Sequence, residues 1–225
     1  MTPFIAADVK SNPQSQTMII KHRGIAPQID PSAYIAPTAT IVGDVKIGAK
    51  TKVMFGAVIN SEGSRISIGE NAIISENAVI RATAEGNKDY PVNIGDNVFT
   101  GPHSTILGAT LEPCSYIATG ATILQGAKIS SGSVVTVGAL VHANTVIPKN
   151  FFVPPNMIAV GEPVQLFSPE QKEEVEKAIL AVGFAKVAFN IDATGKSRAE
   201  IYKETTSVRS TEYDAHFADQ IVKER

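Results

Sequence analysis

The sequence is poor in the features that mark several large classes of protein. Among its 225 residues there is no tryptophan and only one cysteine, Cys114, so no disulfide can form within the chain. A single thiol is typical of a protein that works in a reducing compartment, and we predict a cytoplasmic location. The formal net charge is only −2. We therefore expect no nucleic-acid partner and no attraction to an anionic membrane.

Long hydrophobic runs are missing as well. No apolar stretch approaches the roughly 20 residues that a helix needs to span a bilayer. The first eighteen residues lack a basic start followed by an apolar stretch, so we predict no signal peptide. Hydrophobic residues nevertheless make up 44% of the chain and charged residues 19%. This balance favours a folded protein with a large core over a disordered one.

What the sequence does have is an aliphatic residue at almost every sixth position. The series is interrupted by two insertions and one deletion, and glycine often follows its members. A period of six fits neither an α-helix nor a single strand, whose periods are 3.6 and 2. The series consists of Ile35, Ile41, Ile47, Val53, Ile59, Ile68, Ile74, Ile80, Ile94, Thr100, Ile106, Leu111, Ile117, Ile123, Ile129, Val135, Val141 and Ile147.

Coils of three short strands explain this period. Each coil would hold about eighteen residues, with the aliphatic side chains inside and Gly, Asn or Asp at corners that need positive φ. Successive coils would hydrogen-bond at a spacing of about 4.8 Å. One coil cannot bury its own apolar face, so the stack is the cooperative unit. We therefore predict a mainly β fold, a parallel β-helix; the alternative, a β-sandwich of short strands, does not explain the regular spacing.

Three segments are expected along the chain. Residues 1–28 form an N-terminal extension, residues 29–165 the β-helix domain, and residues 166–225 a C-terminal helical segment.

Two helices are expected in the last segment. Ser168 and the residues after it favour a helix start, with Gln171 placed to reach back. Val175, Ile179 and Val182 form a stripe that we expect to pack along the β-helix. A second helix is expected from about Ser197.

The stretch from Val53 to Pro163 resembles the γ-class carbonic anhydrases of the hexapeptide-repeat superfamily. Its insertions at residues 60–65 and 81–92 fall at the family's places. The resemblance implies left-handed winding and a homotrimer with zinc between its subunits. In that family three histidines, two from one chain and one from its neighbour, hold a zinc-bound water that attacks carbon dioxide.

Other residues stand at the family's three zinc-ligand positions in this chain. By the resemblance these positions hold Arg81, Pro102 and Leu107, and His103 is displaced by one residue from the second. A guanidinium stays protonated and has no free lone pair, and leucine has no donor atom. The chain thus resembles a divergent branch without the usual zinc histidines. We predict no cofactor, no metal except through an atypical ligand set, and no normal zinc-dependent hydration of carbon dioxide.

The resemblance also places a polar pocket between subunits. Asn60, Arg81 and Leu107 should form a column, one residue per coil. We take four residues as candidate catalytic residues and two as binding residues. The catalytic set is Asn60, Glu62, Arg81 and His103, and the binding set is Glu76 and Asn77, with Glu76, Asn77 and His103 coming from the neighbouring subunit.

A small anion or carboxylate is the ligand that this pocket suggests. Arg81 offers a rigid fork of donors, and His103 could act as an acid or base near neutral pH. The alternative is that Arg81 and Glu62 form only an intersubunit ion pair and that His103 is a satisfied corner residue.

Two other functions stay open on the sequence alone. A coenzyme A-dependent hexapeptide acyltransferase would use His103 as its base, although no cationic cluster is visible for the cofactor's phosphates. A non-catalytic structural trimer is the other. Of the remaining histidines, we expect His22 at the surface, His142 solvated or at an interface, and His216 in the second helix without a partner.

Overall fold

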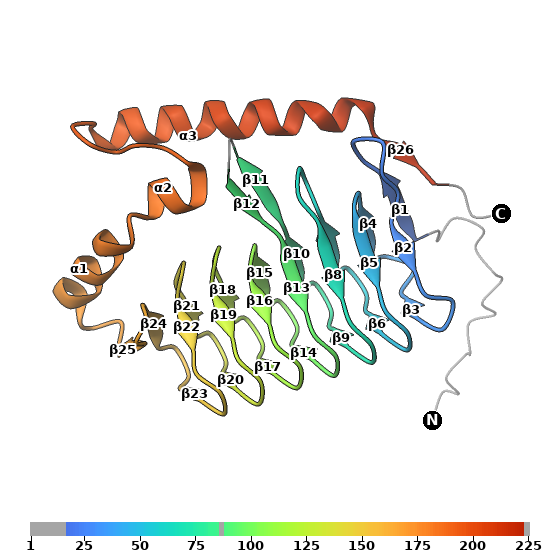
Figure 1. Ribbon diagram of the computed structural model, residues 1–225, viewed down its shortest axis with the longest axis horizontal. Coiled ribbons are helices and arrows are strands. Elements are labelled where there is room, and N and C mark those ends of the chain that lie inside the picture. Colours follow the sequence, from blue (N-terminus) through green and yellow to red (C-terminus); the bar gives the residue numbers. More distant parts are fainter. Residues whose placement is uncertain (1–16, 86–87, 223–225) are drawn as a thin grey trace, which may run out of the picture.

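The computed structural model describes residues 17–85 and 88–222 of the chain. Short parallel strands are stacked into a solenoid, and helices run alongside it (Figure 1). The chain is a left-handed parallel β-helix of about eight turns with C-terminal helices, as the six-residue period and the family resemblance predicted.

Three sheets form the walls of the solenoid, and we call them the first, second and third face in the order in which each coil visits them. The first face is made of β1 (Met18–Lys21), β4 (Thr40–Val42), β7 (Val58–Asn60), β10 (Val79–Arg81), β15 (Thr105–Leu107), β18 (Thr122–Ile123), β21 (Leu140–Val141) and β24 (Ile158–Val160). Two antiparallel strands extend this face at its ends, β25 (Gln165–Phe167) next to β24 and β26 (Gln220–Ile221) next to β1.

The other two faces contain seven strands each. The second face is made of β2 (Gln28–Ile29), β5 (Val45–Ile47), β8 (Ile66–Ile68), β13 (Val92–Ile94), β16 (Thr110–Leu111), β19 (Lys128–Ile129) and β22 (Val146–Ile147). The third face is made of β3 (Tyr34–Ile35), β6 (Lys52–Val53), β9 (Ile73–Ile74), β14 (Phe99–Thr100), β17 (Tyr116–Ile117), β20 (Val134–Val135) and β23 (Phe152–Val153). A separate antiparallel pair, β11 (Thr83–Glu85) and β12 (Lys88–Tyr90), stands out from the coil after β10.

The aliphatic series fills the interior of the solenoid. Ile59, Ile80 and Ile106 are stacked on adjacent strands of the first face, and each is fully buried. Each buried isoleucine stabilises the stack by about 1.5–3 kcal/mol through burial of apolar surface. The strand ladder begins with β1, within the segment that we expected to be an N-terminal extension.

The corners between strands are occupied by residues with positive φ, as the six-residue period requires. Asn77, Asn144 and Asn156 adopt left-handed backbone conformations there, and His103 does the same with φ of 57°. Gly56 lies directly under Asn77, and a Cβ at this glycine would be only 2.1 Å from the Asn77 Oδ1 atom. Glycine is therefore needed at that corner for its close approach as well as for its φ of 71°.

The C-terminal segment folds into α1 (Lys172–Val182), α2 (Phe184–Phe189), α3 (Arg198–Tyr213) and a 3₁₀ helix η1 (Asp214–Ala218). The expected start at Ser168 is wrong, because α1 begins at Lys172, although the Gln171 side chain does accept a bond from the Ser168 amide. The second helix, α3, begins next to Ser197 as predicted, and Ser197 caps it in a reciprocal capping box with Glu200.

Figure 1 shows α3 running beside the solenoid back toward its N-terminal end, where β26 joins β1. Helix α1 has no buried residue, so its apolar stripe packs less closely than expected. Within the described residues, no helix is both long and apolar enough to cross a membrane.

Candidate functional site

The candidate site lies at the corner between the first and second faces, which we call the first corner. Asn60 at the end of β7 pairs with Arg81 at the end of β10, and Arg81 pairs with Leu107 at the end of β15. These pairings confirm the predicted column. They also place the side chains that follow the buried isoleucines on one edge of the solenoid.

Glu62 is turned into this corner by its own backbone. Its φ is 48°, and its amide donates to Asn60 Oδ1 at 2.9 Å while Asn60 Nδ2 donates to Glu62 Oε1 at 2.7 Å. Arg81 Nε donates to the same carboxylate oxygen at 3.2 Å. Glu62 is only 3% exposed. The structure therefore brings together three of the predicted residues, Asn60, Glu62 and Arg81, within one chain.

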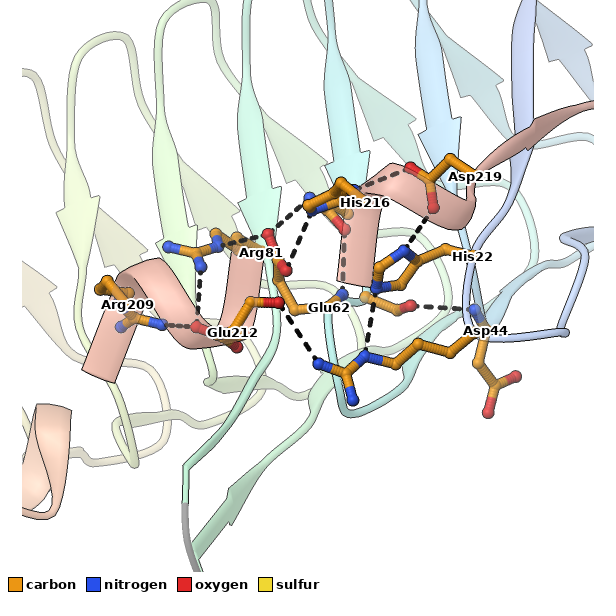
Figure 2. Close-up of polar contacts among 11 residues, drawn as sticks. His22, Asp44, Glu62, Arg81, Arg209, Glu212, His216 and Asp219 are labelled. Atoms are coloured by element: carbon orange, nitrogen blue, oxygen red, sulfur yellow. Dashed lines mark hydrogen bonds and ion pairs between the residues drawn. The ribbon is translucent and has the colours of Figure 1, made fainter. Parts of the chain in front are cut away.

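The C-terminal segment covers this corner with a second carboxylate. Arg81 Nη2 donates to Glu212 Oε2 at 3.3 Å, and Arg209 donates to the same oxygen. The Arg81 guanidinium also lies over the ring of Tyr213, 5.2 Å from its centroid. Figure 2 shows Arg81 between Glu62 of the solenoid and Glu212 of α3. One guanidinium thus links the β-helix to the C-terminal segment.

Two histidines and an aspartate complete the cluster. Asp219 contacts His22 Nδ1 at 2.6 Å through one carboxylate oxygen and His216 Nδ1 at 2.7 Å through the other. His216 Nε2 lies 3.2 Å from Glu62 Oε2. The two imidazole rings are stacked, with centroids 4.4 Å apart. We call His22, Glu62, His216 and Asp219 the histidine–carboxylate cluster.

The expectations for these two histidines were wrong. His22 is buried, with 1% exposure, instead of lying at the surface. It follows β1 directly and precedes a tight turn through Arg23 and Gly24, and the antiparallel pairing of β26 with β1 places Asp219 opposite it. His216 lies in η1 instead of the second helix, and it has two carboxylate partners.

Hydrogen bonding orients the groups of the cluster. Arg23 Nε donates to His22 Nε2 at 3.2 Å, and the other ring nitrogen of His22, Nδ1, faces Asp219. Burial disfavours the charged form of His216, but the hydrogen bond to Asp219 and the charge of Glu62 outweigh it and raise its pKa. Burial likewise opposes ionisation of Asp219, but hydrogen bonds from His216 and His22 lower its pKa.

The other three predicted site residues lie on a different edge of the solenoid. Glu76, Asn77 and His103 lie at the corner between the third and first faces, which we call the second corner. The His103 amide donates to the Glu76 carbonyl at 2.9 Å, so the two residues occupy adjacent coils. Their side chains are not in contact with Arg81 or Glu62 of the same chain, and whether they meet those of a neighbouring subunit stays a prediction.

His142 is buried at the first corner, three coils from Arg81. It is 4% exposed and its ring lies against Phe184 of α2, with centroids 5.3 Å apart. Its Nδ1 atom has no hydrogen-bond partner within the described chain. Burial lowers the pKa of His142. Of the two expected environments, the solvated one was therefore wrong, because α2, which the sequence did not predict, covers His142. A position at an interface between subunits stays a prediction.

A cavity of about 690 Å³ lies elsewhere, among α1, α2 and α3. Its walls include Phe184, Phe189 and Tyr202, and no residue of the histidine–carboxylate cluster lines it. The chemistry of the cluster therefore does not depend on this cavity.

The family's zinc positions do not fit zinc in this chain. Arg81 holds two carboxylates there as a cation, and its neighbour in the column, Leu107, offers no donor atom. A zinc ion at this position would need a side-chain atom with a free lone pair, and Arg81 does not offer one.

The comparisons with known proteins agree with this fold. No protein-family model matches the sequence. The chain is similar to a protein named gamma carbonic anhydrase 1, mitochondrial, from Arabidopsis thaliana, with 35% identity over 44% of this chain and 37% of the relative. It is also similar to a carbonic anhydrase from Geobacillus kaustophilus, with 33% identity over 48% of this chain and 57% of the relative.

Among solved structures, a hexapeptide transferase family protein from Anaplasma phagocytophilum has the same fold. Its TM-score is 0.51 at 20% identity, over 90% of this chain and 98% of that one. This likeness supports the left-handed β-helix fold of the chain. In sequence, part of the chain is similar to γ-carbonic anhydrases, and it spans only 37% to 57% of the length of the two curated relatives described above.

Little in the sequence predicts the C-terminal half of the site. Its one usable signal is the apolar pair Ile221-Val222 after the last helix, which fits an edge strand. That strand, β26, is what brings Asp219 and His216 to His22.

Proposed function

We propose that the chain is a γ-carbonic anhydrase-like homotrimer whose first corner binds bicarbonate or another small carboxylate. In this proposal it does not hydrate carbon dioxide through the family's zinc positions. A cytoplasmic location is part of the proposal and rests on the single cysteine.

The observation that carries the proposal is the engagement of Arg81 with two carboxylates. One belongs to Glu62, which the solenoid holds rigidly, and the other to Glu212, which α3 brings from far along the chain. A planar guanidinium recognises carboxylate geometry well, and such charge-assisted bonds are the strong ones. Glu212 therefore occupies the place that an anionic ligand would take, and a ligand would bind by displacing it.

The proposed trimer would bring the second corner of a neighbour to this place, with Glu76, Asn77 and His103. Outward-facing rings on the third face support such an assembly. Phe99, Tyr116 and Phe152 are 37%, 40% and 56% exposed, and the rings of the first two are in contact at a tilt of 58°, with centroids 5.3 Å apart. A column of exposed aromatic rings beside the second corner is typical of a surface that packs against another subunit.

The anion site is tested with acetate and bicarbonate as probes, by calorimetric titration. Glu212→Gln keeps the shape of the side chain but removes the competing charge. We expect it to bind acetate about tenfold or more tightly than the wild type, since a charge-assisted hydrogen bond contributes about 1.5–3 kcal/mol.

The double variant Glu212→Gln/Arg81→Gln should lose this binding. Absence of acetate and bicarbonate binding in Glu212→Gln, or undiminished binding in the double variant, would contradict the proposal. Glu200→Gln, on the exposed start of α3, is the matched control, because it removes the same charge outside the first corner.

The assembly is tested by the mass of the particle in solution. Tyr116→Glu places a charge within the exposed aromatic column and should convert trimers to monomers. Ser67→Glu places the same charge on the second face, where the outward side chains are polar and exposed, and should leave the trimer intact. A wild-type monomer, or a trimer that tolerates Tyr116→Glu, would refute the proposed assembly.

A further inference from the structure

We infer that His22, Glu62 and His216 form a binding site for a divalent transition metal ion, which ties the C-terminal segment to the β-helix. One ligand atom from each residue lies within 4.8 Å of the other two. His22 and Glu62 are almost completely buried, so these donors are held in place by the fold. The site uses none of the positions Arg81, Pro102 and Leu107.

The donor set is the one that zinc, cobalt and nickel favour. Two imidazole nitrogens and one carboxylate oxygen provide three protein ligands, and a tetrahedral ion would keep a fourth position open. His216 Nε2 and Glu62 Oε2 are 3.2 Å apart. That is close to the ~3.4 Å between two ligands on one tetrahedral zinc. A modest inward movement of His216, carried by the partly exposed η1, would bring the remaining distances into range.

Asp219 gives the two rings the orientation that metal binding needs. Its two carboxylate oxygens contact His22 Nδ1 and His216 Nδ1, as Figure 2 shows. Carboxylates that hold the far nitrogen of a metal-bound histidine fix its tautomer and direct the Nε2 lone pair at the metal. Here one carboxylate does this for both rings, which is more than a structural ion pair requires. Asp219 is thus a positioning residue.

A positively charged side chain, that of Arg23, already occupies part of the proposed metal site. The Arg23 guanidinium donates to His22 Nε2, the lone pair that would bind the metal. Arg23 lies on an exposed turn, so its side chain can swing away without disturbing the solenoid. The Arg23 guanidinium also donates to the Glu212 carbonyl at 3.5 Å. The metal would replace its bond to His22 with an ion that bonds both histidines and Glu62. Because His22 and Glu62 belong to the solenoid and His216 to η1, binding would hold the C-terminal segment in place.

Metal binding is tested on the full chain with Zn²⁺ and Co²⁺ after removal of metals by a chelator. We expect one ion per chain by elemental analysis, and cobalt absorption bands typical of four-coordination. Hydrogen exchange should slow in η1 and β26 when zinc is added, a readout that requires no activity. Less than a tenth of an ion per chain would overturn the inference.

Variants decide whether the bound ion occupies this cluster. His216→Ala, which removes a partly exposed ligand from η1, should abolish the cobalt spectrum. Asp219→Asn keeps all three ligand atoms and should weaken zinc binding by about 10–100-fold. His103→Ala, at the exposed second corner, is the matched control and should bind normally.

Cobalt binding that survives His216→Ala, or that is lost in His103→Ala, would overturn the assignment. Arg81→Gln separates this inference from the proposed anion site, because it should end acetate binding and preserve one zinc per chain. Loss of zinc from a folded Arg81→Gln variant would also contradict the metal site at His22, Glu62 and His216.

Discussion

Asp219→Asn should release the C-terminal segment from the β-helix even without metal. In the wild type, each oxygen of this carboxylate accepts a bond from one histidine, at 2.6 and 2.7 Å. An asparagine side chain has only one acceptor oxygen. Its NH₂ group would face the Nδ1–H of the second ring, and two donors cannot form a hydrogen bond with each other. One of the two bonds must therefore be lost, and the ring that loses it is His22 or its stacked partner His216.

The free-energy cost of Asp219→Asn follows from the loss of one of these two hydrogen bonds. A hydrogen bond to a charged group contributes about 1.5–3 kcal/mol, and a buried donor left without a partner costs about 1–3 kcal/mol. We expect a loss of about 3 kcal/mol, or roughly a hundredfold increase in the opening equilibrium of the segment. The loss should be local, because β26 and η1 can separate from β1 while the stacked coils stay folded.

Native-state hydrogen exchange in the presence of a chelator measures this opening. The Val222 amide, which donates to the Ile19 carbonyl at 2.7 Å, reports the β26–β1 pairing directly. Asp192→Asn removes an aspartate from an exposed turn of the same segment and serves as the control. Unchanged protection of Val222 in Asp219→Asn, or an equal loss in Asp192→Asn, would refute the reasoning.

The same opening should depend on pH. The folded state raises the pKa of His216 above its ordinary value of 6.5. The contribution of protonated His216 is then complete below pH 6.5 and is lost as the pH rises through the raised pKa. The lowered pKa of Asp219 keeps its contribution in place above its ordinary value of 3.8 and removes it only in stronger acid. Docking should therefore weaken from neutral toward alkaline pH.

Three further predictions concern the scaffold. Burial lowers the pKa of His142 below 6.5. The contribution of neutral His142 to the free energy of unfolding should therefore be complete above pH 6.5 and fall as the pH drops toward the lowered pKa. Thermal unfolding between about pH 5 and 8 should show this decline in the wild type and not in His142→Phe. Ile106→Ala should cost about 2–5 kcal/mol in urea unfolding, whereas an equal cost for the outward Thr105→Ala would contradict the assigned register. Ser197→Ala should lose about 1 kcal/mol of protection in the first turn of α3, and unchanged exchange there would argue against the capping box.

The solenoid was predictable because its signal is local and repeated. Most strands carry an inward aliphatic residue six positions after that of the strand before, so a single error does not change the register. Asn60, Arg81 and Leu107 follow directly from that register, since each comes one residue after a buried isoleucine. Glu62 was placed correctly because it lies only two residues beyond the same strand.

The rest of the cluster was hidden by distance along the chain. His22 and Asp219 are 197 residues apart, and a two-residue strand joins them. So short a strand has no periodicity to detect. The basic neighbours of His22 favour a surface position, and only the antiparallel pairing of β26 buries it. Contacts of this kind depend on tertiary packing that overrides the local pattern.

The most direct test is a zinc anomalous difference map from crystals of the full chain grown with Zn²⁺. It locates the metal without any assumption about activity. We predict one peak per chain between the side chains of His22, Glu62 and His216, and none at the Arg81–Leu107 column. A peak between Arg81 and the partner subunit's second corner, with the histidine–carboxylate cluster empty, would contradict the account.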